Sequence, residues 1–146
     1  MRIIIPLDLS ETAAKAVAPA LDLARGAGDE VQFVTVVGRR LRADLSDLAA
    51  KQNTTVPDMV EAYLKSTAAD AAGLPVTWAA ITGDEAAESL IDFATGEDIR
   101  MVVMATHGRS GIERWRLGSV TERVVRHSEV PVLVIPTRKA GTPANR

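Results

Sequence analysis

The chain has 146 residues, enough for one domain with a sizeable core, and its 47% hydrophobic and 25% charged residues are typical of globular proteins. A net charge of −2 gives no reason to expect a nucleic-acid partner, and the absence of cysteine excludes disulfides and thiolate chemistry. The apolar start is too short for a signal peptide and no apolar run approaches the roughly 20 residues of a membrane helix, so we expect a cytoplasmic protein without a membrane partner.

The first part of the chain alternates apolar and amphipathic segments. Arg2–Leu7 is a mostly apolar run, typical of a strand buried on both faces. Ser10 is expected to cap a helix that runs to about Arg25, and Pro19 should kink this helix or remove one hydrogen bond. Glu30–Val37 is the expected second strand.

The middle of the chain contains its hardest segment to interpret, Arg39–Thr55, where spaced leucines suggest only one or two helical turns. A clearer helix is expected over Asp58–Ala72, because its apolar residues share one face. Pro75–Thr82 is the expected third strand. Asp84 is expected to cap the next helix, which should run to about Thr95.

The last part repeats the alternation. A strand is expected over Arg100–Ala105, a helix over Ser119–His127 and a final strand over Val130–Ile135. Alternating strands and helices predict a parallel sheet with helices on both faces. We expect a single domain over residues 1–137, followed by a polar tail over residues 138–146.

The segment Met104–Thr121 joins an apolar strand to a helix through a glycine-rich turn. A helix N-terminus presents unpaired backbone N–H groups and the positive end of the helix dipole, which together favour phosphate. Glycine permits close approach of the backbone to a ligand. The glycines of this turn are Gly108, Gly111 and Gly118.

This segment resembles the nucleotide-binding signature of the universal stress protein family, Gly-x2-Gly-x9-Gly-Ser/Thr. Alanine replaces the first glycine, and the remaining spacing is intact. The resemblance extends from about Met1 to Pro136 and implies a doubly wound, Rossmann-like sheet with strand order 3-2-1-4-5. The matching positions are Ala105, Gly108, Gly118 and Ser119.

In that strand order the winding reverses between the first and fourth strands, where ligands of open α/β sheets bind. The reversal brings Pro6 and Asp8 beside Ala105 and the glycine loop. Asp8 is expected to accept hydrogen bonds from ribose hydroxyls, and the alternative is that it only caps the first helix. The family pattern Pro-x-Asp-x-Ser matches residues 6–10.

Other candidate residues each have a functional and a structural interpretation. The resemblance implies that the backbone of Val36 contacts adenine, although an apolar residue at a strand end also suits a core. Arg109 suits a bidentate phosphate contact, or it belongs to a solvated basic loop. Ser119 and Thr121 can cap the helix or touch phosphate, and Val120 would add a backbone N–H.

The sequence favours binding over fast catalysis. It contains no Gly-x4-Gly-Lys-Ser/Thr motif, and no lysine lies in the glycine loop. His107 has no partner in a recognised catalytic spacing, and with His127 as the only other histidine there is no metal-site pattern. The expected ligand is ATP or AMP, with Mg²⁺ as an optional companion.

The leading hypothesis is therefore a cytoplasmic, adenine-nucleotide-binding stress-response protein that acts as a nucleotide-dependent dimer. The alternatives are a slow ATP hydrolase and a dimeric interaction module that has lost nucleotide, the latter suggested by Ala105. The resemblance implies a homodimer through the edge strand Val130–Pro136. Pairing with a symmetry mate would cover the free N–H and C=O groups of that edge.

Overall fold

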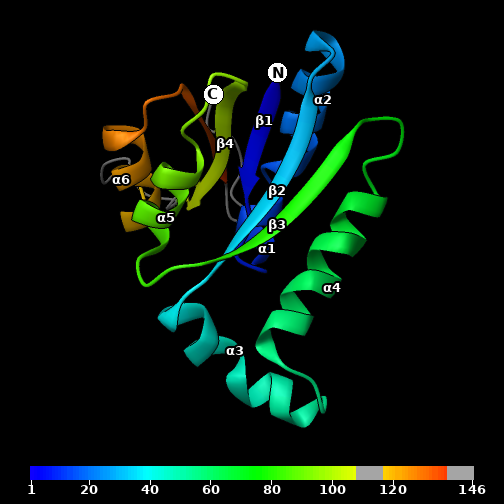
Figure 1. Cartoon of the computed structure of the whole chain (residues 1–146), viewed down its shortest axis with the longest axis vertical. Helices are drawn as coiled ribbons and strands as arrows, with labels where there is room; N and C mark the ends of the chain where they lie inside the picture. Colours follow the sequence, from blue (N-terminus) through cyan, green and yellow to red (C-terminus); the bar gives the residue numbers. More distant parts are fainter. Residues whose placement is uncertain (108–116, 138–146) are drawn as a thin grey trace, which may run out of the picture.

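A five-stranded sheet forms the centre of the structure, a computed structural model that describes residues 1–107 and 117–137. None of the helices in this described part is long and apolar enough to cross a membrane. The strands are β1 (Arg2–Pro6), β2 (Glu30–Val37), β3 (Val76–Thr82), β4 (Ile99–His107) and β5 (Val132–Thr137). The helices are α1 (Glu11–Ala14), α2 (Val17–Ala27), α3 (Arg39–Lys51), α4 (Val56–Ala69), α5 (Ala86–Phe93) and α6 (Ser119–His127) (Figure 1).

The strands lie in the order β3-β2-β1-β4-β5, and every neighbouring pair is parallel. This confirms the expected doubly wound α/β fold and its strand order. The chain winds outward from β1 through β2 to β3, then returns to the other side of β1 with β4 and β5. The direction of winding therefore reverses between β1 and β4, and the strands run toward the end of the molecule where α3 lies (Figure 1).

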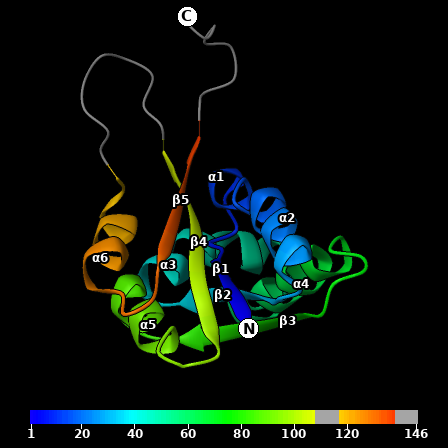
Figure 2. The ribbon, with the colours of Figure 1, turned by 90° about the horizontal axis from the view of Figure 1, so that it is seen from above.

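Helices cover both faces of the sheet, with α1, α2 and α4 on one face and α5 and α6 on the other (Figure 2). Successive residues of β1 point to opposite faces. Ile3 and Ile5 are buried in the core beneath the first group of helices, and Ile4 is buried beneath the second. A strand that is buried on both faces needs an apolar residue at nearly every position, which explains the continuous apolar run of β1.

The first expected helix is broken into α1 and α2, which Lys15 and Ala16 separate. Pro19 has no N–H and cannot donate a hydrogen bond to the carbonyl of Lys15, four residues earlier. The amides of Lys15 and Ala16 instead donate to carbonyls three residues back, those of Thr12 and Ala13. The expected effect of Pro19 is therefore present as a break in the helix.

Helix α3 is longer than the one or two turns that its leucines suggested. It spans 13 residues, yet Ala49 is its one buried residue. Leu41 and Leu45 are half-buried against the core, while the rest of the helix is mostly charged and exposed. So few core positions leave little apolar periodicity for sequence analysis to detect.

Most expected boundaries differ by one to three residues, as for α4 (Val56–Ala69) and β4 (Ile99–His107), and two of the differences concern the cap of α5 and the edge strand. The N-cap of α5 is Glu85 rather than Asp84, and its side chain makes no capping hydrogen bond. The edge strand begins at Val132, two residues later than expected, and it includes Pro136 instead of ending there. Proline is tolerated in β5 because this strand lies at the edge of the sheet, where a missing N–H need not interrupt a ladder.

A buried carboxylate joins three strands at the amino end of the sheet. Asp29, just before β2, is 1% exposed and accepts hydrogen bonds from Nε of Arg100 and, at 3.1 Å, from Nη2 of the same side chain. The amino group of Met1 lies 3.2 Å from the carboxylate. The hydrogen bond from Arg100 lowers the pKa of Asp29 below its ordinary value of 3.8, against the opposing effect of burial, and the amino group adds to the lowering.

Candidate functional site

The carboxyl end of β1 brings an acidic side chain to the surface. Pro6 and Leu7 are buried, and the amide of Leu7 donates to the carbonyl of Val34 at 2.8 Å. The next residue, Asp8, is exposed. Its Oδ1 accepts hydrogen bonds from the amide of Ser10 at 3.0 Å and from the Ser10 hydroxyl at 2.5 Å. Asp8 thus begins an Asx turn that fixes its carboxylate at the end of the strand.

The cap of α1 is Ser10 and not Asp8. The Ser10 Oγ accepts a hydrogen bond from the amide of Ala13 at 3.1 Å, which satisfies one of the free N–H groups of the first turn. Among the described residues, the hydrogen bonds of the Asp8 carboxylate all use Oδ1. Oδ2 is therefore available to accept a hydrogen bond from a ligand hydroxyl.

The carboxyl end of β2 lies beside that of β1. Val36 is buried in the core beneath α5 and α6 and pairs with Ile81 of β3. Gly38 follows as the N-cap of α3. A Cβ on Gly38 would lie 2.5 Å from the carbonyl oxygen of Gly83, so two backbone segments approach each other here more closely than any side chain allows.

The carboxyl end of β4 is joined to the start of α6. Ala105 pairs with Ile135 of β5 and is half-buried. The hydroxyl of Thr106, 5% exposed, accepts a hydrogen bond from the amide of Gly118 at 3.4 Å. The Thr106 carbonyl accepts one from the Thr137 hydroxyl at 2.6 Å. The first contact anchors the beginning of α6 to the end of β4, and the second joins the ends of β4 and β5.

The expectation that Ser119 or Thr121 caps α6 is wrong. The N-cap is Gly118, and no side chain makes a capping hydrogen bond there. Ser119 is exposed at the first helical position, Val120 is half-buried and the side chain of Thr121 is buried. Among the described residues, no side chain caps the first-turn amides of α6, so these amides can donate to a ligand. Thr121 can contribute its backbone but not an exposed hydroxyl.

Two of the predicted site residues, Gly108 and Arg109, lie outside the described residues, as do Gly111 and the side chain of His107. The other predicted residues are brought to one edge of the sheet. Asp8 follows the end of β1, and Thr106 lies near the end of the parallel neighbour β4, so both lie at the carboxyl edge of the sheet. Pro6, Asp8, Val36, Ala105 and Gly118–Thr121 all lie on strands or loops that meet at this edge.

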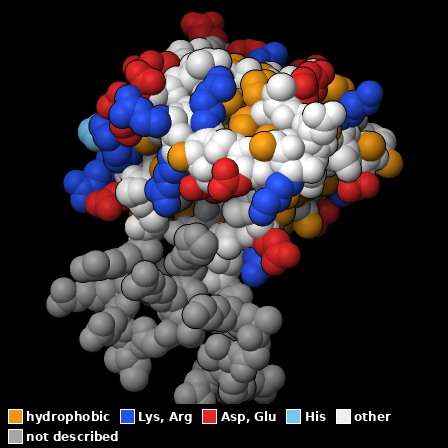
Figure 3. Space-filling model, turned by 90° about the horizontal axis from the view of Figure 1, so that it is seen from below, with side chains coloured by type: hydrophobic (Ala, Val, Ile, Leu, Met, Phe, Trp, Pro, Cys, Tyr) orange, Lys and Arg blue, Asp and Glu red, His pale blue; other side chains and the backbone are white. Residues whose placement is uncertain are grey.

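The described side chains on the face of the molecule at this edge carry charges of both signs (Figure 3). Basic and acidic side chains are mixed over the face shown in Figure 3. In the described part of the chain, no group of three or more His, Asp or Glu side chains comes together to hold a metal ion. Recognition here therefore depends on local groups: a carboxylate for hydroxyls and helix N–H groups for an anion.

Sequence analysis missed three contributors to this edge. The role of Thr106 was not predicted because its sequence context is that of an ordinary strand residue. Ser10 was predicted as a helix cap, but its role as a hydrogen-bond donor to Asp8 depends on the geometry of the turn. Leu9 has a φ of 67°, and this left-handed conformation could not be predicted because leucine rarely adopts it. The Pro-x-Asp-x-Ser pattern was the one available signal for Ser10.

Comparison with known proteins agrees with this architecture. The model of the universal stress protein family matches residues 1–136. Universal stress protein MJ0531 of Methanocaldococcus jannaschii is 28% identical over 148 aligned residues, covering 94% of this chain and 83% of that protein. The solved structure of protein MJ0577 superposes with a TM-score of 0.74 at 23% identity, covering 95% of this chain and 97% of the other.

Two further structures of the same fold were solved with nucleotides. A universal stress protein in complex with cAMP has a TM-score of 0.67 at 20% identity, covering 92% of this chain and 96% of that chain. The Archaeoglobus fulgidus universal stress protein in complex with dAMP has a TM-score of 0.61 at 23% identity, with the same coverage of 92% and 96%.

Proposed function

This chain belongs to the universal stress protein family, and we propose that it binds an adenine nucleotide, ATP or AMP, at the carboxyl edge of its sheet. The observation that carries the proposal is that Asp8 follows β1 and α6 follows β4, the two neighbouring strands between which the winding reverses. Two proteins of the same fold have been solved with cAMP and dAMP, which supports the choice of ligand class.

Each group at the edge has a role that its chemistry allows. Oδ2 of Asp8 accepts a hydrogen bond from a ribose hydroxyl, and the backbone of Val36 contacts adenine at the end of β2. The amides of Ser119 and Val120 donate to phosphate, with the helix dipole favouring the negative charge. Arg109 supplies a guanidinium to the same phosphate.

Small residues let the ligand approach the backbone. Gly108 and Gly118 have no Cβ, and Ala105 replaces a third glycine with a single methyl group. Pro6 shapes the chain at the end of β1, and Thr121 contributes its backbone N–H because its side chain is buried. We propose that Mg²⁺ binds only together with ATP, because the Asp8 carboxylate is assigned to the ribose and not to a metal ion.

The proposed role is binding rather than fast turnover, because the loop contains no lysine to stabilise a transferred phosphoryl group. We expect phosphate release from ATP to be far slower than the roughly 10 per second of an ordinary enzyme. A slow ATP hydrolase is the alternative, and rapid phosphate release that is lost in a His107→Ala variant would favour it.

We further propose a cytoplasmic stress-response protein whose single domain, residues 1–137, forms a homodimer through β5 and carries a polar tail over residues 138–146. In this proposal the bound nucleotide changes which partner the dimer contacts. The alternative is a dimeric module without nucleotide, in which the methyl group of Ala105 obstructs the site.

Titration calorimetry with AMP and with ATP tests the proposal. We expect a Kd in the micromolar range, about −8 kcal/mol, for the wild-type protein. Asp8→Ala should weaken binding at least about tenfold by removing the ribose contact. Asp22→Ala, which removes an exposed carboxylate on α2, is the matched control. No heat of binding in the wild type would favour the nucleotide-free module, and equal affinity in Asp8→Ala would exclude the assigned ribose site.

A further inference from the structure

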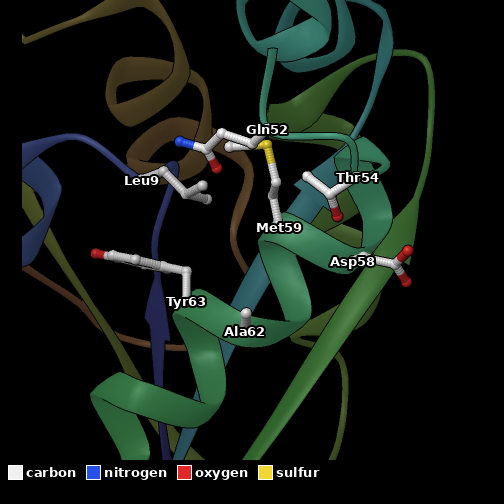
Figure 4. A pocket seen from close by; sticks show the side chains of 7 residues that line it. All are labelled: Leu9, Gln52, Thr54, Asp58, Met59, Ala62 and Tyr63. Carbon is white, nitrogen blue, oxygen red and sulfur yellow. The ribbon is translucent and has the colours of Figure 1, made fainter. Parts of the chain in front are cut away.

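A groove of about 400 Å³ lies beside the turn that carries Asp8. It is lined by Leu9 from that turn, by Gln52 and Thr54 between α3 and α4, and by one side of α4. In the view of Figure 4, Leu9, the ring of Tyr63 and the amide of Gln52 lie on one side of Met59, and Thr54 and Asp58 lie on the other. The α4 residues that line the groove are Asp58, Met59, Ala62 and Tyr63.

Leu9 holds an unfavourable backbone conformation. Its φ of 67° lies in the left-handed region, and Asn53 is the one other non-glycine residue with positive φ in the described part of the chain. Asparagine adopts this region readily after a helix, whereas a bulky leucine is an outlier there. Such a conformation persists only where the surrounding structure compensates for it.

The compensation comes from packing of the Leu9 side chain. Leu9, Met59 and Tyr63 are all half-buried against the same core cluster, the one beneath α1, α2 and α4. The three side chains also line the same groove. The apolar side chains of Leu9, Met59 and Tyr63 thus gather in one place, between the turn and α4.

The shape of the turn determines where the Asp8 carboxylate lies. Leu9 is the central residue between Asp8 and Ser10, and the carboxylate accepts hydrogen bonds from both the amide and the hydroxyl of Ser10. Both hydrogen bonds therefore close across Leu9 in its left-handed conformation, so the φ of Leu9 is part of the geometry that anchors Asp8.

The charge of Asp8 also acts on Tyr63. Burial raises the pKa of the Tyr63 phenol above its ordinary value, and the negative charge of Asp8 raises it further. The turn that carries Asp8 and the helix that carries Tyr63 also line one groove, through Leu9 and Tyr63, although they are far apart in the sequence.

We propose that Leu9 and Tyr63 are positioning residues, which hold the Asp8 carboxylate in the orientation that receives a ribose hydroxyl. The proposal rests on the nucleotide-binding function proposed above. It assigns α4 a part in the site, although no residue of this helix needs to touch the ligand. Tyr63 acts through its ring, which supports Leu9, and Leu9 acts through its backbone.

Two pairs of variants separate positioning from general stability. Leu9→Asn loses the apolar packing but introduces a residue whose backbone adopts positive φ without compensation, whereas the β-branched residue of Leu9→Val disfavours positive φ. Tyr63→Phe keeps the ring and Tyr63→Ala removes it. Val60→Ala is the control, because Val60 is fully buried on α4 but does not line the groove.

The first readout is the amide resonance of Ser10 during acid titration of the ¹⁵N-labelled protein. This resonance moves when the carboxylate that accepts its hydrogen bond takes up a proton. We expect the movement in the wild type, Leu9→Asn, Tyr63→Phe and Val60→Ala, and its loss in Leu9→Val and Tyr63→Ala. The same response in all six proteins would overturn the proposal whether or not nucleotide binds.

The second readout is the affinity for AMP. We expect Leu9→Val and Tyr63→Ala to bind about tenfold more weakly than the wild type, and Leu9→Asn and Tyr63→Phe to stay within about threefold. Equal affinity in all variants, despite a changed Ser10 response, would refute a role of these residues in binding. The expected Ser10 responses in a wild type that binds no AMP would support the positioning of Asp8 and refute the nucleotide function.

Discussion

Replacing Asp29 with asparagine should destabilise the protein at neutral pH and should leave the carboxyl edge of the sheet unchanged. The Asp29 carboxylate is 1% exposed and accepts two hydrogen bonds from the Arg100 guanidinium, with the amino group of Met1 3.2 Å away. An asparagine can accept with one atom only, and its NH₂ group would face donors. The substitution therefore leaves cationic donors without an acceptor.

The expected cost follows from the burial of these partners. Removing one member of a fully buried ion pair costs about 3 to 5 kcal/mol, and losing one hydrogen bond to a charged group costs about 1.5 to 3 kcal/mol. The side chain of Arg100 is 39% exposed and can recover water, so the lower range applies. We expect a loss of about 2 kcal/mol in the free energy of unfolding, or about 6 to 8 °C in Tm for a domain of this size.

Urea unfolding at several pH values measures this loss and its pH dependence. The pKa of Asp29 is lower in the folded protein than its ordinary value of 3.8, so its contribution is complete above that value and disappears as the pH falls through the folded pKa. The difference between wild type and Asp29→Asn should be constant from pH 7 to about pH 5 and shrink in more acidic solution.

The matched control is Asp98→Asn, because Asp98 forms an exposed ion pair with Arg2 at the same end of the sheet. That pair should contribute less than about 1 kcal/mol. If Asp29→Asn is as stable as this control at pH 7, or if its deficit grows on acidification, the role assigned to the Asp29 carboxylate is wrong.

Three further predictions concern the site and the assembly. Ala105→Gly should change nucleotide affinity in calorimetry by no more than about tenfold, or ~1.4 kcal/mol, and a change from no binding to tight binding would show that the alanine disables the site. Gly38→Ala should lower the urea stability by about 1 to 3 kcal/mol because its Cβ meets a carbonyl oxygen at 2.5 Å, while Gly26→Ala, in open space, should not. Light scattering should show a wild-type dimer and a Val134→Lys variant shifted toward the 15.5 kDa monomer, and a wild-type monomer would exclude the dimer.

The sequence was sufficient to predict the strands and their alternation with helices. Strand β1 has a continuous apolar run and β2 is mostly apolar because both are buried on both faces, and such segments stand out in a sequence. The order of the strands came from the resemblance to a family, since neither periodicity nor composition specifies which strands are neighbours. Helix α3 was underestimated because one buried alanine leaves almost no pattern to detect.

The residues of the candidate site were predictable where a motif marks them, and their arrangement was not. Asp8 and Gly118 belong to recognisable patterns, and both lie at the expected edge. The sequence does not show that Gly118 is the N-cap of α6, because this depends on backbone angles. The contribution of Tyr63 depends on packing between segments that are distant in the sequence, which no local pattern encodes.

The central claim is that an adenine nucleotide binds at the carboxyl edge between β1 and β4. The measurement that tests it most directly is a titration of ¹⁵N-labelled protein with AMP, followed residue by residue through the amide resonances. We expect saturable shifts at Asp8, Val36, Ser119 and Val120, and none at Asp29 on the opposite edge. Unchanged resonances up to about 1 mM AMP, which corresponds to binding weaker than about −4 kcal/mol, or shifts confined to another face, would contradict the claim.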